Sequence, residues 1–239
     1  MLENLKIQIF ADGADLENIK ELCKNPLIKG FTTNPSLMKK KNIIDYKKFA
    51  LDVLRVTKNK PVSFEIFADD LENMMKQALE ISTWGKNVNV KIPITNTKGE
   101  KTTEIIKKLS NKKIVCNVTA ILTVKQLKSV VEVLNSGTPA ILSVFAGRIA
   151  DTGLDPMNIM KEAVNISKEK PQASVLWAST REVLNIFQAE KIGCHIITVP
   201  HSLLGKLTNI GKNLEIFSME TVKDFYKDAK SAGYSIELK

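Results

Sequence analysis

The feature that most constrains this chain is a repeat of short apolar segments, each followed by a stretch with helical periodicity. Eight such segments are rich in β-branched residues, and their starts lie 20 to 34 residues apart, which leaves room for one helix and two loops. Continuous apolar runs separated by helices are typical of parallel strands that are buried on both faces. The predicted strands are 7–12, 30–34, 62–67, 88–94, 114–120, 140–146, 174–179 and 194–200.

Eight consecutive strand–helix units in 239 residues predict an α/β protein with a (β/α)8 fold, the TIM barrel. The alternative is an open doubly wound sheet. That fold more often has about six or seven strands, and its glycine-rich phosphate-binding fingerprint is missing from this sequence. We expect a single barrel domain over residues 1–239, with a C-terminal helix at about residues 219–233.

Several classes of protein are excluded by what the chain lacks. No apolar run approaches the roughly 20 residues that a membrane-spanning helix needs. The N-terminal segment carries an early Glu and Asp and lacks the pattern of a signal peptide, so we expect a cytoplasmic protein with no membrane partner. Cys23, Cys116 and Cys194 are far apart, and the histidines are only His195 and His201. We therefore expect neither a disulfide framework nor a metal site.

The formal charge of +9 has three possible explanations: nucleic-acid binding, acidic substrates such as sugar phosphates, or a lysine-rich coding bias. The lysines are spread along the chain without a basic-aromatic cluster, and we expect no nucleic-acid partner. Arginine is scarce, at three residues among 35 basic ones. Arg55 lies in a helical pattern, whereas Arg148 and Arg181 follow predicted strands. A planar guanidinium suits phosphate or carboxylate better than an ammonium group does.

Polar residues interrupt strands that should be apolar throughout. They are Asp12, Asn34, Glu65, Lys91, Asn117, Thr119, Ser143, Ser179 and Arg181. Any one of them could make a structural hydrogen bond, and Asp12 could cap the next helix, although Asp15 is also available for that role. Most stand near the carboxyl ends of the strands, which meet at the mouth of a barrel. The sequence therefore predicts an active site at that mouth.

Lys91 is the most informative of these residues, because it lies in the middle of a strand with apolar neighbours. Burial disfavours the charged ammonium form and leaves an amine that is nucleophilic near neutral pH. Its expected chemistry is an imine with a carbonyl substrate. The alternative is a structural ion pair with a buried carboxylate.

Two segments carry a specific resemblance to a known family: GFTTNPSL at 30–37 and VNVKIPIT at 88–95. They resemble the G-[VF]-T-T-N-P-S-L signature and the V-K-I-P lysine segment of the transaldolase family. Four weaker matches follow in family order and extend the resemblance over nearly the whole chain. These are CNVTAIL (116–122), LSVFAGRIAD (142–151), WASTR (177–181) and CHIITVP (194–200).

The resemblance implies a class I, cofactor-free transferase that moves dihydroxyacetone units between sugar phosphates. Lys91 would condense with the ketose C2 carbonyl, and Asp12 would act as general acid and base at the C4 hydroxyl. Glu65 and Thr119 would hold a catalytic water for the proton transfers of imine formation. The implied substrate-binding residues are Asn34, Asn117 and Ser143 for the dihydroxyacetone hydroxyls, Arg148, Arg181 and Ser179 for the phosphate, and Phe145.

The family also contains fructose-6-phosphate aldolases, which cleave rather than transfer. Gln is usual there at the position of Glu65 and Tyr at that of Phe145, so this chain favours transfer. We expect a transaldolase of the pentose phosphate pathway, with sedoheptulose 7-phosphate or fructose 6-phosphate as donor. An aldolase-like lyase and an enzyme of a specialised sugar pathway stay open as alternatives, because Gly13 and Val144 depart from the family pattern. The length resembles the small family subunits that form homo-oligomers, namely decamers of two pentameric rings.

Overall fold

The structure is a computed structural model that describes residues 4–237. The chain divides into two compact units, and the division falls between Leu204 and Gly205. The first unit holds all eight strands. The second unit contains a 3₁₀ helix, η2 (Gly205–Asn209), and the helix α11 (Leu214–Ser231).

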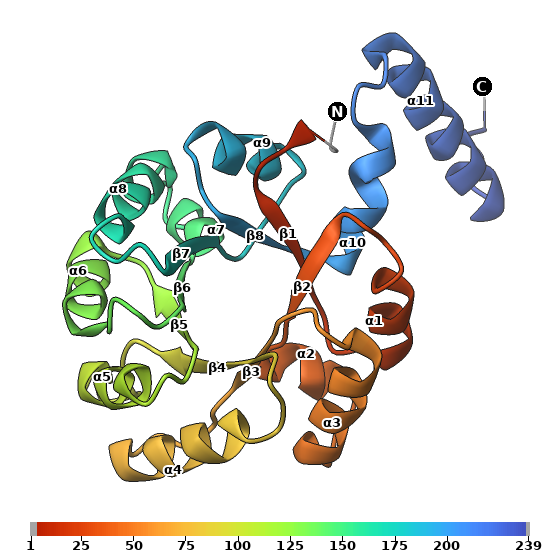
Figure 1. Ribbon diagram of the computed structural model, residues 1–239. Helices are drawn as coiled ribbons and strands as arrows, with labels where there is room; N and C mark the ends of the chain where they lie inside the picture. The colour runs from red at the N-terminus through yellow and green to blue at the C-terminus, as the bar shows by residue number, and fades with distance from the viewer. Residues whose placement is uncertain (1–3, 238–239) are drawn as a thin grey trace. The chain divides into compact units, whose positions relative to one another are not determined.

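The first unit is a closed barrel of parallel strands whose order around the barrel is their order in the sequence (Figure 1). Pairing of the first strand with the last closes the sheet. The predicted (β/α)8 barrel is thereby confirmed. The strands are β1 (Gln8–Asp12), β2 (Ile28–Thr32), β3 (Val62–Glu65), β4 (Val88–Pro93), β5 (Cys116–Ile121), β6 (Ala140–Val144), β7 (Ala173–Trp177) and β8 (Ile196–Pro200).

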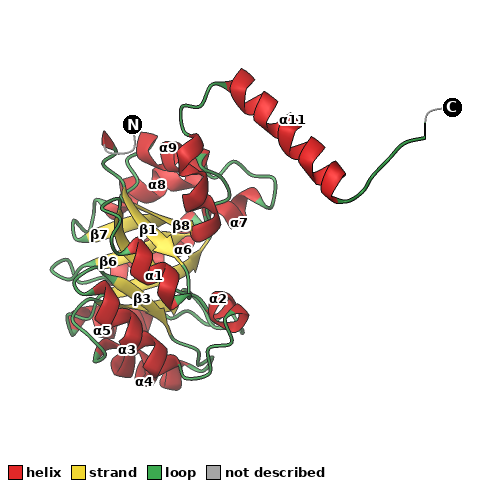
Figure 2. Ribbon diagram, turned by 90° about the vertical axis from the view of Figure 1, so that its right-hand side faces the viewer, coloured by secondary structure: helices red, strands yellow, loops and turns green. Residues whose placement is uncertain are grey.

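Each strand is followed by at least one helix, and the helices enclose the strands when the barrel is seen from the side (Figure 2). Their buried residues recur with the helical period, as Phe49, Ala50 and Val53 do in α3. The helices are α1 (Leu16–Leu22), α2 (Pro35–Lys40), α3 (Tyr46–Thr57), α4 (Leu71–Ser82), α5 (Thr103–Asn111), α6 (Val124–Val133), α7 (Ala146–Ala150), α8 (Met157–Ser167), α9 (Leu184–Lys191) and α10 (His201–Leu204).

The interior of the barrel is layered, and an apolar layer lies beneath the mouth. Phe10, Ile141 and Ile196 belong to one buried cluster, and each stands two residues before a polar residue of its strand. Because residues two apart in a strand face the same side, the polar residues form the next layer towards the carboxyl ends. Gly30 makes room for this packing, since a Cβ there would lie 2.6 Å from the Phe10 ring.

The C-terminal helix α11 covers Leu214–Ser231, where the sequence predicts a helix at about residues 219–233. Asn213 caps its first turn by accepting hydrogen bonds from the backbone N–H groups of Glu215 and Ile216. A single domain over residues 1–239 stays a prediction, and its limits include terminal residues outside the described range. Between residues 4 and 237, no helix is both long enough and apolar enough to cross a membrane.

Candidate active site

Ten of the eleven predicted site residues line one cavity of about 420 Å³ at the carboxyl ends of the strands. The exception is Arg181. The cavity also receives hydroxyl side chains that sequence reasoning missed. The ten residues are Asp12, Asn34, Glu65, Lys91, Asn117, Thr119, Ser143, Phe145, Arg148 and Ser179.

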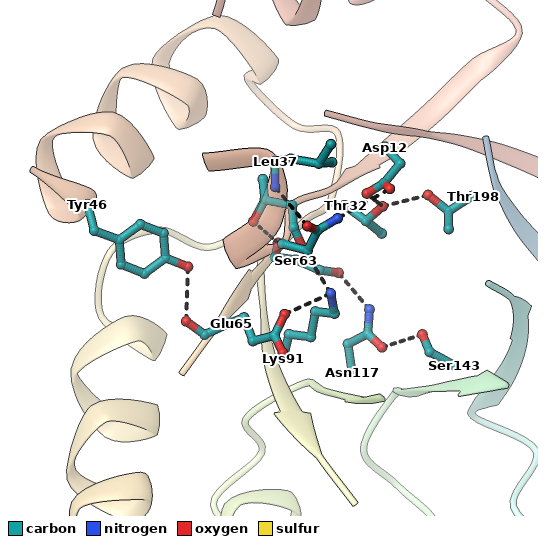
Figure 3. Close-up of polar contacts among 12 residues, drawn as sticks. Asp12, Thr32, Leu37, Tyr46, Ser63, Glu65, Lys91, Asn117, Ser143 and Thr198 are labelled. Carbon is teal, nitrogen blue, oxygen red and sulfur yellow. Dashed lines mark hydrogen bonds and ion pairs between the residues drawn. The ribbon is translucent and has the colours of Figure 1, made fainter. Parts of the chain in front are cut away.

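Lys91 projects from β4 into this cavity between two polar neighbours on adjacent strands. It is in register with Glu65 on β3 and with Asn117 on β5, so all three side chains share the inner face. The lysine is 8% exposed, and its Nζ lies 2.9 Å from Glu65 Oε2 and 2.9 Å from the backbone oxygen of Thr33 (Figure 3). The ion pair that the sequence left open as an alternative is therefore present, and its carboxylate belongs to the same cavity.

Asp12 ends β1 and is held by one hydroxyl group and one amide. Thr32 Oγ1 donates to Asp12 Oδ1 at 2.8 Å, and Asn34 Nδ2 lies 3.4 Å from Asp12 Oδ2. Thr198 Oγ1 lies 2.5 Å from the Thr32 hydroxyl, so the three residues form a chain across β8, β1 and β2 (Figure 3). Asp15, rather than Asp12, caps α1 by accepting from the backbone N–H of Asn18.

The environment of Asp12 favours its protonated form. Burial raises the pKa of the Asp12 carboxyl above its ordinary value of 3.8, and the Lys91 ammonium group only partly offsets that effect. A carboxyl group whose pKa moves towards neutrality can both accept and return a proton. Asp12 is thus suited to acid–base chemistry beside the lysine.

Asn34 lies beyond the end of β2 and caps α2, whereas the sequence placed it at the end of a strand. Its side chain accepts a hydrogen bond from the backbone N–H of Leu37, and Pro35 occupies the first helical position. The cap turns the chain sharply after Thr32 and fixes the amide at the rim of the cavity. The N–H groups of the Asn34 amide remain available as hydrogen-bond donors to Asp12 or to a ligand.

Asn117 is oriented by two serine hydroxyl groups, one on β3 and one on the adjacent strand β6. Its Nδ2 donates to Ser63 Oγ at 2.9 Å, and its Oδ1 accepts from Ser143 Oγ at 2.6 Å. These bonds fix which end of the amide faces which serine. Asn117 and Ser143 thus lie side by side, as Figure 3 shows.

Thr119 lies on β5 next to an irregularity in the strand. The pairing with β6 shifts between Val118 and Ile121, and Ala120 between them has φ +61°, a backbone conformation unusual for a residue with a side chain. Thr119 is 2% exposed, and among the described residues its Oγ1 has no hydrogen-bond partner. An unpartnered hydroxyl group that borders a cavity is available to a ligand or a water molecule.

Phe145 forms an apolar part of the cavity wall. It is partly buried and packs against the cluster that contains Phe10, Leu176 and Ala178. Together with Leu176 and Ala178, the aromatic ring gives an apolar side to a cavity whose other lining residues are mostly polar.

Arg148 and Ser179 line the cavity beyond the ends of β6 and β7, and Gly147, next to Arg148 in the chain, packs against the Ser179 backbone. A Cβ on Gly147 would lie 1.8 Å from the Ser179 carbonyl oxygen, so only glycine fits there. Arg148 is exposed on α7 and is available to an anion. Arg181 also lies against Gly147, but its Nη2 is paired with Asp151 Oδ2 at 2.5 Å, and it does not line the cavity.

The residues that sequence reasoning missed are the hydroxyl partners Thr32, Ser63 and Thr198. All three could have been predicted from the sequence, because side chains alternate between the inner and outer faces along each strand. Ser63 stands two residues before Glu65, while Thr32 and Thr198 each occupy the inward position of a motif that was already singled out. Each binds a predicted site residue or its partner, so they position the site rather than add new chemistry to it.

Two comparisons with known proteins, one with family models and one with single proteins, point to the same family. A family model described as transaldolase/fructose-6-phosphate aldolase matches residues 9–237. A "Probable transaldolase" of Dehalococcoides mccartyi is 38% identical over 199 residues, which cover 83% of this chain and 88% of that protein. A "Probable transaldolase" of Nitrosopumilus maritimus is 33% identical over 231 residues, which cover 94% of this chain and all of that protein.

Solved structures with low identity share the fold alone. A crystal structure of 2,3-dimethylmalate lyase, a member of the PEP mutase/isocitrate lyase superfamily, aligns with a TM-score of 0.54 and 12% identity. The alignment covers 100% of this chain and 88% of that one. At this identity the likeness supports the barrel architecture and carries no statement about chemistry.

Proposed function

The chain belongs to the transaldolase/fructose-6-phosphate aldolase family, and on that premise we propose that it transfers a dihydroxyacetone unit from a ketose phosphate to an aldose phosphate through a Schiff base on Lys91. The transaldolase relatives identify the protein as a transferase. The observation that carries the proposal is a buried lysine in a cavity, within 2.9 Å of a carboxylate and near a second carboxyl group of raised pKa.

The first step is imine formation. The Lys91 amine attacks the C2 carbonyl of the ketose, and a water molecule leaves as the C=N bond forms. The attacking nitrogen must lose protons and the carbonyl oxygen must gain them. The carboxylate of Glu65, 2.9 Å from Nζ, is placed to accept protons from the amine. The free hydroxyl of Thr119 can hold the water that passes them on.

The second step breaks the C3–C4 bond. Asp12 takes the proton of the C4 hydroxyl, the aldose phosphate leaves as an aldehyde, and the electrons of the C3–C4 bond move into the protonated imine, which becomes a neutral enamine. The raised pKa of Asp12 favours proton uptake. In the reverse direction, Asp12 returns the proton when the enamine attacks the acceptor aldehyde. Hydrolysis of the new imine then releases the product.

The remaining residues bind the substrate. Asn34, Asn117 and Ser143 stand around Lys91 with hydrogen-bonding groups that suit the dihydroxyacetone hydroxyls. Arg148 and Ser179 at the rim suit the phosphate group. Arg181 would join them only by exchanging its carboxylate partner Asp151 for the phosphate.

The wider setting of the enzyme is also a proposal. Sedoheptulose 7-phosphate or fructose 6-phosphate is the proposed donor, in the pentose phosphate pathway and in the cytoplasm. The proposed assembly is a homo-oligomer of the decameric kind. The chemistry requires no metal or organic cofactor, because the lysine itself supplies the electron sink.

Borohydride trapping with fructose 6-phosphate tests the proposal. Intact and peptide mass spectrometry should reveal a three-carbon adduct on Lys91, because cleavage leaves dihydroxyacetone on the lysine. Lys91→Ala should give no adduct and no transfer, whereas Lys128→Ala, a change on the exposed face of α6, should behave like the wild type. Turnover that survives in Lys91→Ala would refute the imine mechanism.

The second candidate is a lyase that releases free dihydroxyacetone, since the family description covers both activities. Assaying dihydroxyacetone release without an acceptor separates the two. We expect little release from the wild type and more from a Glu65→Gln, Phe145→Tyr double variant. Equal release from both would show that these two positions do not set the outcome.

A further inference from the structure

Tyr46, the first residue of α3, packs its ring into an aromatic cluster on the outer side of β3. Its ring centroid lies 6.2 Å from that of Phe64, 4.6 Å from that of Phe67 and 5.4 Å from that of Trp84. Phe64 is fully buried and stands one residue before Glu65, on the opposite face of the strand. The ring of Tyr46 is therefore fixed against the segment that carries the catalytic carboxylate.

The phenol group of Tyr46 is bonded to the backbone of Glu65. Its hydroxyl donates to the Glu65 carbonyl oxygen at 3.0 Å (Figure 3). The other end of the same peptide group is also held, because the N–H of Ile66 donates to the Lys91 carbonyl oxygen at 3.1 Å. Burial raises the pKa of the Tyr46 phenol, so the hydroxyl keeps the proton that it donates.

We propose that Tyr46 is a positioning residue that sets the direction of the Glu65 side chain towards Lys91. The inference rests on the transaldolase function proposed above. Tyr46 binds the carbonyl oxygen of the Glu65–Ile66 peptide group, and β4 binds its N–H group. The Glu65 carboxylate on the inner side of the strand then lies 2.9 Å from Lys91 Nζ. No part of Tyr46 lines the cavity, so it acts through Glu65 and not on the substrate.

The competing explanation is that Tyr46 only packs the wall of the barrel. Tyr46→Phe separates the two, because it keeps the ring in the aromatic cluster and removes one hydroxyl group. The matched control is Thr138→Val. Thr138 Oγ1 also donates to a backbone oxygen, that of Ser110, at 2.8 Å, but it precedes β6 at the other end of the barrel.

Kinetics of transfer and of borohydride trapping are measured for the wild type and both variants, with thermal unfolding alongside. Tyr46→Phe should lower kcat and the rate of adduct formation about 5-fold and leave KM unchanged. A change of about 5-fold is what the net free energy of one ordinary hydrogen bond would produce in a rate. Thr138→Val should lose similar thermal stability and keep its kcat. If the two variants lose stability alike and both keep kcat, Tyr46 is only a packing residue and the proposal is wrong.

A double variant tests whether the effect passes through Glu65. In a Glu65→Gln background, which lacks the carboxylate, Tyr46→Phe should cause no further loss of kcat. An equal 5-fold loss in both backgrounds would overturn the positioning role. A wild-type enzyme that forms no Lys91 adduct would overturn the proposed function and this inference together, whereas a wild-type adduct with unchanged Tyr46→Phe kinetics would overturn this inference alone.

Discussion

Replacing Lys91 by methionine separates the chemical role of the ammonium group from its structural role. Methionine keeps most of the length of the side chain in β4 but removes the terminal ammonium group and its charge. Glu65 then loses its cation at 2.9 Å, and the backbone oxygen of Thr33 loses its donor. Both losses occur in the buried mouth of the barrel, where an unpaired group is costly.

The size of the effect follows from the burial of the pair. Breaking a fully buried ion pair by removing one partner costs about 3–5 kcal/mol. The side chain of Lys91 is 9% exposed and that of Glu65 is 16% exposed, and Glu65 borders a cavity that solvent can enter. We therefore expect the lower end, about 3 kcal/mol, for Lys91→Met. For a chain of this size that lowers Tm by about 6–12 °C.

A double variant completes the experiment. In Lys91→Met, Glu65→Gln no charge of the pair is left, so most of the lost stability should return, to within about 1 kcal/mol of the wild type. Urea and thermal unfolding of the four proteins measure this, and borohydride trapping should be silent in both Lys91 variants. A single variant as stable as the wild type, or a double variant less stable than either single one, would refute the energetic interpretation of the pair.

Three further outcomes are expected. Asp12→Asn should be inactive and more stable than the wild type at pH 7–8. The pKa of Asp12 is raised in the folded protein, so protonation of Asp12 stabilises the wild type as the pH falls through that pKa. The difference in Tm between Asp12→Asn and the wild type should therefore shrink towards low pH in a pH series. Gly147→Ala would force the Ser179 carbonyl to move by about 1.5 Å to reach ordinary contact, so KM for fructose 6-phosphate should rise at least about tenfold in a folded protein, and an unchanged KM would contradict this. Cys116 and Cys194, whose pKa burial raises to about 12, should react with a thiol reagent only after unfolding, which a colorimetric titration with and without urea measures.

Much of the barrel and of its site could be predicted because both depend on local periodicity. Glu65, Lys91 and Asn117 are separated by 26 residues each, yet they became neighbours in register because every strand–helix unit returns the chain to the same layer. Their polarity inside apolar strands was visible without coordinates. Ten of the eleven predicted residues line one cavity at the carboxyl ends of the strands, and their roles there stay a prediction.

Other features left no trace in the sequence. Ala120 takes a positive φ near the carboxyl end of β5, although alanine carries no preference for that conformation. Arg181 looked equivalent to Arg148, but its pairing with Asp151 could not be read from a strand pattern. Asn34 was placed in a strand because a cap and a strand end share extended backbone geometry.

The amino-acid sequence by itself determined the fold, the inner face of each strand and the position of the lysine, because burial alternates along strands and helices with fixed periods. Only the tertiary structure decided which partner each polar group has. Thr198 reaches Thr32 across 166 residues, and Tyr46 reaches the backbone of Glu65 from a helix on the outside of the barrel. Such contacts depend on separations of about 3 Å between side chains of different elements, and that precision comes from packing the whole barrel rather than from any local pattern.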